Sequence, residues 1–233
     1  MRNPLVNRRM LLGQGVAAGV GAAGVNCFGR QVAAAQSTPT VEQPQAGCDP
    51  LALLPVVPSF TLSSTDVADG EVMGTPQMSG IAGAGGQDRS PQLTWSGFPD
   101  TTMSFCVTMY DPDAATESGF WHWAVVDVPG NVTALASGAG AAGDGQLPAG
   151  AFQLPNDLRL AQYLGAAPPP TDPPHRYYLV VSALDVTSLG VPKDATPAFL
   201  GFNIGQHIVG RAVLVPLARG QAAGTPAAGT PAP

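Results

Sequence analysis

One sequence feature limits how this chain can fold more than any other: short runs of β-branched, aromatic and aliphatic residues. Each run is ended by glycine, proline or aspartate. Such runs are typical of strands, and the residues that end them are typical of turns. The predicted strands cover residues 59–62, 92–95, 104–110, 120–128, 177–184 and 212–217. With 29 glycines and 24 prolines, we expect only one helix, at about 196–210, and a short turn near 157–163. The pattern predicts a mainly β fold with antiparallel strands rather than repeated strand–helix–strand units.

Charged residues are sparse, and most of them are acidic. Ten basic residues face sixteen acidic ones, which gives a formal net charge of -6. Four of the basic residues lie in the first 35 residues, and all of the acidic ones lie after them. Nucleic acids and anionic membranes attract basic surfaces, and this acidic remainder would be repelled by both. We therefore expect no nucleic-acid partner.

The first 35 residues resemble a twin-arginine export signal. Arg8 and Arg9 precede an uncharged stretch rich in glycine and alanine, and Ala33-Ala34-Ala35 has the small residues of a cleavage site. We predict a signal peptide at 1–35, export to the periplasm, cell envelope or medium, and no stable membrane anchor after cleavage. An uncleaved anchor is the alternative.

The rest of the chain is predicted to divide into a linker at 36–55, a folded domain at 56–218 and a disordered Ala/Gly/Thr/Pro tail at 219–233. Cys27 could be a lipid-modified cysteine, although the preceding asparagine argues against this. In an oxidising compartment Cys48 and Cys106 could form a disulfide. The alternative is that Cys106, which lies in an apolar run, is buried packing.

Two histidines lie in unusual positions beside a pair of carboxylates. His122 lies between two tryptophans of one strand, and His175 follows a proline-rich loop. Asp111 and Asp113 end the preceding strand, and Tyr177 could add a phenolic hydrogen bond. A cationic imidazole can hold a phosphate or carboxylate, and a nearby aspartate orients the ring and raises its pKa. Each feature also has a structural reading, because a histidine between tryptophans often belongs to the core and Asp-Pro-Asp often forms a turn.

Three segments in this order carry a resemblance to a known family: Asp111-Pro112-Asp113-Ala114, the run 119–126, and His175-Arg176-Tyr177. They resemble the motifs of the phosphatidylethanolamine-binding protein family, in its bacterial Raf-kinase-inhibitor-like branch. The segment 90–97 and Asn156-Asp157 add supporting matches. The resemblance implies a large antiparallel sheet packed on a smaller sheet, with a few peripheral helices.

The resemblance also implies a pocket for small anions such as phosphate, phosphorylated head groups or acetate. The residues that match the family's pocket are Asp111, Asp113, His122, His175, Tyr177 and Pro169. The chain departs from the family pattern at Ala115 and Ala166, where prolines are usual, and at Leu158-Arg159, which replaces Phe-Gly. We therefore expect a looser pocket rim and an altered ligand preference.

Three kinds of function fit these observations. The favoured one is a non-enzymatic binding protein for a small anion or phosphorylated molecule. The second is a secreted inhibitor or regulator of a kinase or protease, which acts on a protein partner. The third, a metal-dependent hydrolase, is weakest: the sequence has no His-x-x-x-His spacing, and no glycine loop before a helix indicates a cofactor. We expect no catalytic residues, no metal and no cofactor.

Overall fold

The structure is a computed structural model that describes residues 49–220. The predicted signal peptide, Cys27, Cys48, residues 36–48 of the linker and residues 221–233 of the tail lie outside this range. Those predictions stay predictions. Cys106 lies within the range and is a free, buried thiol.

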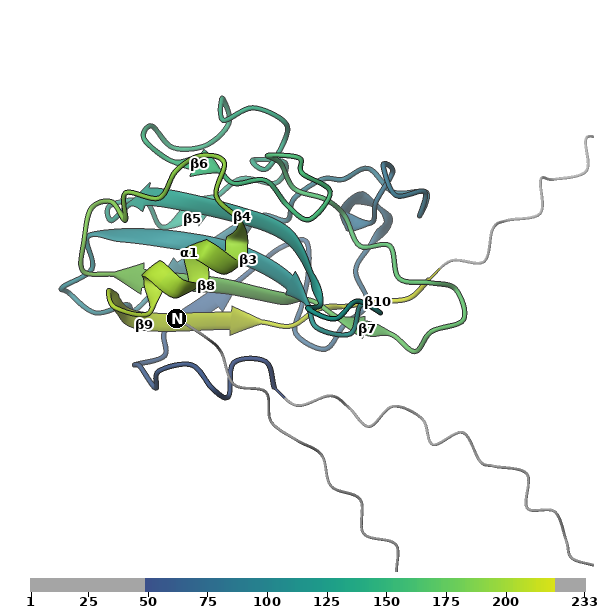
Figure 1. The fold of residues 1–233 in the computed structure, drawn as a ribbon, viewed down its shortest axis with the longest axis horizontal. Helices are drawn as coiled ribbons and strands as arrows, with labels where there is room; N and C mark the ends of the chain where they lie inside the picture. The colour runs from purple at the N-terminus through teal and green to yellow at the C-terminus, as the bar shows by residue number, and fades with distance from the viewer. Residues whose placement is uncertain (1–48, 221–233) are drawn as a thin grey trace, which may run out of the picture. The chain divides into compact units, whose positions relative to one another are not determined.

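A five-stranded sheet forms the centre of the described part, and all of its neighbouring strands are antiparallel. Figure 1 shows its long strands side by side. In spatial order they are β6 (Phe152–Gln153), β4 (Phe120–Pro129), β3 (Ser104–Asp111), β8 (Tyr178–Leu184) and β9 (Ile208–Leu214). The residue composition of these segments favours strands. Strand β8, for example, is a run of mostly aromatic and aliphatic residues that is buried along its whole length.

Two smaller sheets complete the fold. One contains β1 (Thr61–Ser63), β2 (Leu93–Ser96) and β5 (Ala134–Leu135), and the other pairs β7 (His175–Arg176) with β10 (Leu217–Ala218). A 3-10 turn, η1, spans Thr75–Gln77. The predicted fold class, a large antiparallel sheet on a smaller one, is confirmed.

The main core lies between the large sheet and the three-stranded sheet. Alternate residues of β3, such as Phe105 and Val107, point into it, and the ring of Phe105 packs against Trp95 of β2. The opposite face of the large sheet carries a second apolar cluster, in which Cys106 packs with Leu200 and Ile204 of the helix. The large sheet is therefore covered on both faces, and Figure 1 shows the helix lying across one of them.

The predicted helix at 196–210 is only half as long as expected. Helix α1 spans Pro197–Ile204, with the Thr196 side chain accepting a hydrogen bond from the N–H of Phe199. Gly205 ends it, and β9 begins at Ile208 rather than at 212. The predicted end of the helix was wrong because residues 208–214 pair with β8 and form backbone hydrogen bonds along it. A longer helix would prevent this pairing. Within residues 49–220, no helix is long and apolar enough to cross a bilayer.

Candidate functional site

A cavity of about 190 Å³ lies where β3 ends and β4 begins. Pro112 follows the last residue of β3 and has no N–H to continue a sheet ladder, so the chain turns there. Asp111 pairs with Phe120 across the two strands, which places both at the cavity wall. The lining residues are Ala82, Asp111, Ala114, Ala115, Phe120, His122, Leu158, Leu164, Gly165, Ala167, Pro168, Pro169, His175 and Tyr177.

Asp111 organises one side of the cavity from a buried position. Its Oδ1 accepts hydrogen bonds from the N–H groups of Asp113 (2.8 Å) and Ala114 (3.0 Å). Its Oδ2 lies 2.9 Å from Nδ1 of His175. A carboxylate only accepts, so Nδ1 of His175 carries a proton and the ring is held in one orientation. Nε2 of the same ring lies 3.5 Å from Oδ2 of Asp172, in the proline-rich loop.

The ring of His122 is also fixed by a hydrogen bond, but its protonation state differs from the one predicted. Its Nδ1 lies 3.0 Å from the carbonyl oxygen of Leu164, so this nitrogen is the donor. Phe120 and Tyr177 pack on the ring, with centroids 4.8 and 5.1 Å away. Burial lowers the pKa of His122, despite opposing effects from the Leu164 carbonyl and Asp111, so the ring is neutral at neutral pH. The expectation of a cationic ring with a raised pKa is wrong for this histidine.

Tyr177 and Pro169 also line the cavity, as predicted. Tyr177 is fully buried, and its ring packs against that of His122. Burial, together with the charge of Asp111, raises the pKa of Tyr177 well above its usual range, so this hydroxyl stays protonated.

Asp113 is the one predicted pocket residue that does not line the cavity. Its carboxylate forms a two-pronged ion pair with Arg176, with Nε 2.9 Å from Oδ2 and Nη2 2.7 Å from Oδ1. The Arg176 N–H also donates to Oδ2. Burial alone would raise the pKa of Asp113, but these contacts hold it below its usual value. Asp113 therefore joins the turn after Asp111 to β7. In this geometry its carboxylate does not face a ligand in the cavity.

Asp88 is a structural contributor that the sequence analysis missed. Its carboxylate accepts hydrogen bonds from Ser79 Oγ, Gly80 N, Ile81 N and Gly165 N, at 2.7, 2.9, 2.8 and 2.8 Å. These bonds join two loops that both supply cavity residues. A lone aspartate in a glycine-rich stretch gives no signal of this role.

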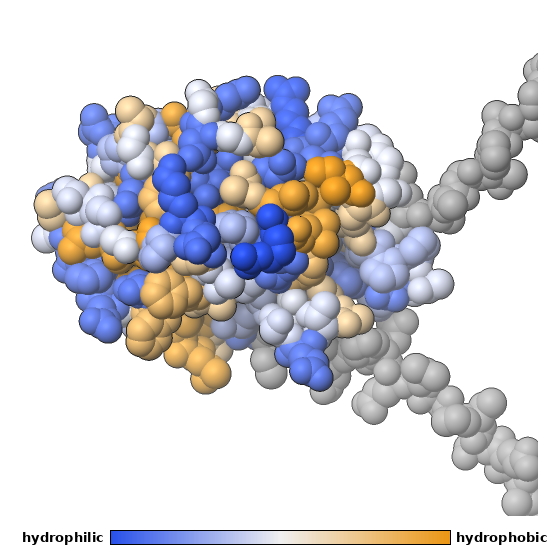
Figure 2. All heavy atoms as spheres, turned by 45° about the horizontal axis from the view of Figure 1, so that its top comes forward, coloured by the Kyte–Doolittle hydropathy of each residue, from blue (hydrophilic) through white to orange (hydrophobic). Residues whose placement is uncertain are grey.

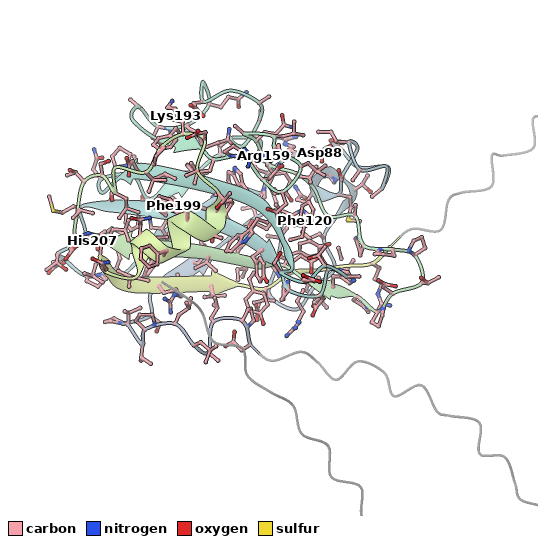
Figure 3. All side chains as sticks on the ribbon, viewed as in Figure 1. Asp88, Phe120, Arg159, Lys193, Phe199 and His207 are labelled. Atoms are coloured by element: carbon pink, nitrogen blue, oxygen red, sulfur yellow. The ribbon has the colours of Figure 1, made fainter. Side chains whose placement is uncertain are left out.

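The residues that depart from the family pattern lie in different places. Ala115 and Leu158 line the cavity, and Leu158 is exposed, so both belong to the rim. Ala166 is fully buried and bridges to Met78 instead. Arg159 has a φ of 65°, the left-handed region where glycine is favoured. Figure 3 shows Asp88, Phe120 and Arg159 in the same half of the fold, away from His207.

Comparisons with known proteins agree with this geometry. The model of the family "Phosphatidylethanolamine-binding protein" matches residues 63–218. The Escherichia coli K12 protein YbcL is 40% identical over 159 residues, which covers 68% of this chain and 87% of YbcL. YbhB from the same organism is also 40% identical, over 146 residues, covering 63% of this chain and 91% of YbhB. The chain therefore belongs to the phosphatidylethanolamine-binding protein family.

A solved structure and a more distant relative extend the comparison. The crystal structure of E. coli YbcL, described as a member of the mammalian PEBP family, aligns with a TM-score of 0.68 at 39% identity. The alignment covers 70% of this chain and 99% of that one. A Mycobacterium tuberculosis H37Rv protein that carries the name lipoprotein LppC is 33% identical over 162 residues, covering 69% of this chain and 73% of that protein.

Proposed function

We propose that this chain is an exported, non-enzymatic binding protein whose cavity holds a small anion or the phosphorylated head group of a larger molecule. One observation carries the proposal: two buried imidazoles, His122 and His175, line the same small cavity, and each ring is fixed through its Nδ1. Buried polar groups placed in this way in a pocket with apolar walls are typical of specific ligand sites.

The state of the rings suggests which form of the ligand binds. Because His122 is neutral and donates through Nδ1, its Nε2 carries a lone pair that can accept a proton from the ligand. Hydrogen phosphate or the monoanion of a phosphate monoester brings such a proton, whereas the dianion that a monoester forms above its second pKa of about 6 does not. The volume of about 190 Å³ suits a head group rather than a whole lipid.

The environment favours binding over catalysis. The oxygens of Asp111 are already engaged by backbone N–H groups and by His175, which makes this carboxylate a poor nucleophile. Cys106 belongs to the cluster on the other face of the large sheet, and burial raises its pKa to about 12. Among the described residues, no group of three or more His, Cys, Asp or Glu side chains is arranged to hold a metal ion.

Export is supported by the signal-like segment at 1–35 and by the name of the mycobacterial relative, which places that protein among lipoproteins. Fractionation of cells that express the full chain tests this part. We expect a shortened chain in the envelope or medium, and the full-length chain confined to the cytoplasm would contradict export.

Calorimetric titration with phosphate and with phosphorylethanolamine tests the site. The variants His122→Phe and His175→Gln keep much of the side-chain volume but remove the imidazole, and each should weaken binding at least about tenfold. His207→Gln is the matched control, because His207 does not line the cavity and pairs with Asp185 at 3.0 Å. Equal affinity in all four proteins would refute the proposed site.

A further inference from the structure

A second cavity, of about 290 Å³, lies on the outer face of the large sheet, and nothing in the proposed function uses it. It lies between helix α1 and the segment 50–55, over strands β3, β8 and β9. The lining residues are Pro50, Leu51, Leu54, Pro55, Thr108, Tyr110, Trp121, Tyr178, Val180, Ser182, Pro197, Ala198, Gly201, Ile204, Gly205 and Arg211. We refer to it as the outer groove.

The outer groove is separate from the histidine cavity, although β4 contributes to both. Trp121 lines the groove and its neighbour His122 lines the histidine cavity, as expected when successive side chains of a strand point to opposite faces. The two cavities share no lining residue. The outer groove is therefore a candidate site separate from the histidine cavity.

The walls of the outer groove are mainly apolar and aromatic. Tyr110 and Trp121 pack against each other with ring centroids 4.5 Å apart, and aliphatic residues and prolines supply most of the rest. Exposed apolar side chains also lie on the two segments that flank the groove, since Leu54 is 43% exposed and, in α1, Phe199 is 47% and Phe202 73% exposed. Figure 2 shows an apolar patch at the lower left, over the position of α1. Exposed apolar surface beside an apolar cavity is typical of a binding site.

Among the described residues that line the groove, Arg211 alone carries a full charge. One of its guanidinium N–H groups donates to the carbonyl of Pro55 at 3.1 Å, and within residues 49–220 it forms no ion pair with a carboxylate. Burial lowers the pKa of Arg211, while Asp49 opposes this effect from beyond ion-pair distance. A partly desolvated guanidinium at the edge of an apolar groove is suited to a carboxylate that arrives with an apolar chain.

We propose that the outer groove binds a small amphiphile with one apolar chain and a carboxylate head. The chain lies against Trp121, Tyr178 and Val180, and the carboxylate pairs with Arg211. The volume of about 290 Å³ lies just below the usual range for ligand pockets, about 300 to 1,000 Å³, which favours a medium-length single chain over a two-chain lipid.

Gly201 offers a way to close the groove without damaging the fold. It lies within α1 and lines the groove, and a Cβ added there meets no atom within 4 Å. Gly201→Phe therefore fills the groove, while the helix gains from the loss of an interior glycine. Gly201→Ala is the matched control, since it makes the same backbone change and leaves the groove open.

The experiment is a titration of the full chain with decanoate and with decanol, followed by calorimetry and tryptophan fluorescence. Trp121 lines the groove, whereas Trp95 and Trp123 are buried elsewhere, so the fluorescence change should vanish in Trp121→Phe while calorimetric binding remains. We expect saturable decanoate binding that Gly201→Ala keeps and Gly201→Phe weakens at least about tenfold. Arg211→Gln should weaken decanoate about tenfold and leave decanol nearly unchanged.

Three results would overturn the proposal. The first is the absence of saturable decanoate binding to a folded wild-type chain. The second is binding that Gly201→Phe leaves intact but His122→Phe abolishes, which would assign the amphiphile to the histidine cavity. The third is a concentration-dependent dimer that Gly201→Phe disrupts, with no decanoate binding, which would assign the groove to a second copy of the chain.

Discussion

Replacing Asp88 by asparagine should destabilise the fold and loosen the histidine cavity together. The carboxylate accepts four hydrogen bonds, two at each oxygen. Asparagine has one oxygen, so it can keep one pair of donors while its NH₂ group faces the other pair. Two charge-assisted bonds of about 1.5–3 kcal/mol each are then lost.

The measured cost should be smaller than this sum, because Asp88 is only half-buried and the freed N–H groups of Gly80 and Ile81 reach water. We expect Asp88→Asn to lower the free energy of unfolding by about 2–3 kcal/mol, or the melting temperature by about 5–10 °C. Phosphate affinity should fall as well, since Gly165 of the cavity wall loses its anchor. Asp69→Asn is the control: its exposed carboxylate accepts only from Val215 N, and asparagine keeps an acceptor there.

The pH dependence gives this prediction a second test. Burial alone would raise the pKa of Asp88, but the hydrogen bonds from Gly165, Ile81, Ser79 and Gly80 lower it. A lowered pKa stabilises the fold above the ordinary aspartate pKa, and this stabilisation is lost as the pH falls through the folded-state value. Thermal unfolding followed by circular dichroism should therefore show wild type and Asp88→Asn converging in acid. A variant within about 0.5 kcal/mol of wild type at neutral pH, or a difference that does not change with pH, would refute the reasoning.

Three further predictions concern single residues. Asp113→Asn should lower the free energy of unfolding by about 1–2 kcal/mol through the weakened pair with Arg176 while leaving phosphate affinity within about twofold, and a large loss of affinity by calorimetry would restore Asp113 to the pocket. Cys106, whose pKa burial raises to about 12, should react with a thiol reagent only in the unfolded chain, and rapid native-state labelling would contradict its burial. Burial lowers the pKa of His122, so the stability due to its neutral ring should be complete above the ordinary histidine pKa and decline as the pH falls toward the lowered value. His122→Phe should show a weaker decline in denaturant unfolding across that window, and parallel profiles would argue against a buried neutral ring.

The sequence predicted the strands and most of the cavity well because both depend on local signals. Asp111-Pro112 ends a buried strand by its own chemistry, because proline has no N–H to continue the sheet ladder. The order of the motifs then brings His122, His175 and Tyr177 together, as the structure shows.

Features that depend on distant contacts were not predictable in this way. The extent of α1 is set by the pairing of β9 with β8, and the partner of Asp113 is set by the position of strand β7, some sixty residues away. The lowered pKa of His122 arises from its burial, which a motif does not reveal. The outer groove needs residues from five elements and the segment 50–55, none of which forms a motif alone.

The most direct test of the central claim is the ring nitrogen NMR spectrum of His122 and His175 during a phosphate titration of the full chain. Without phosphate, we expect His122 to be neutral with its proton on Nδ1. Saturating phosphate should shift the Nε2 signals of both rings and leave His207 unchanged. If the signals of His122 and His175 do not move at millimolar phosphate or phosphorylethanolamine, the cavity is not an anion site and the proposed function is wrong.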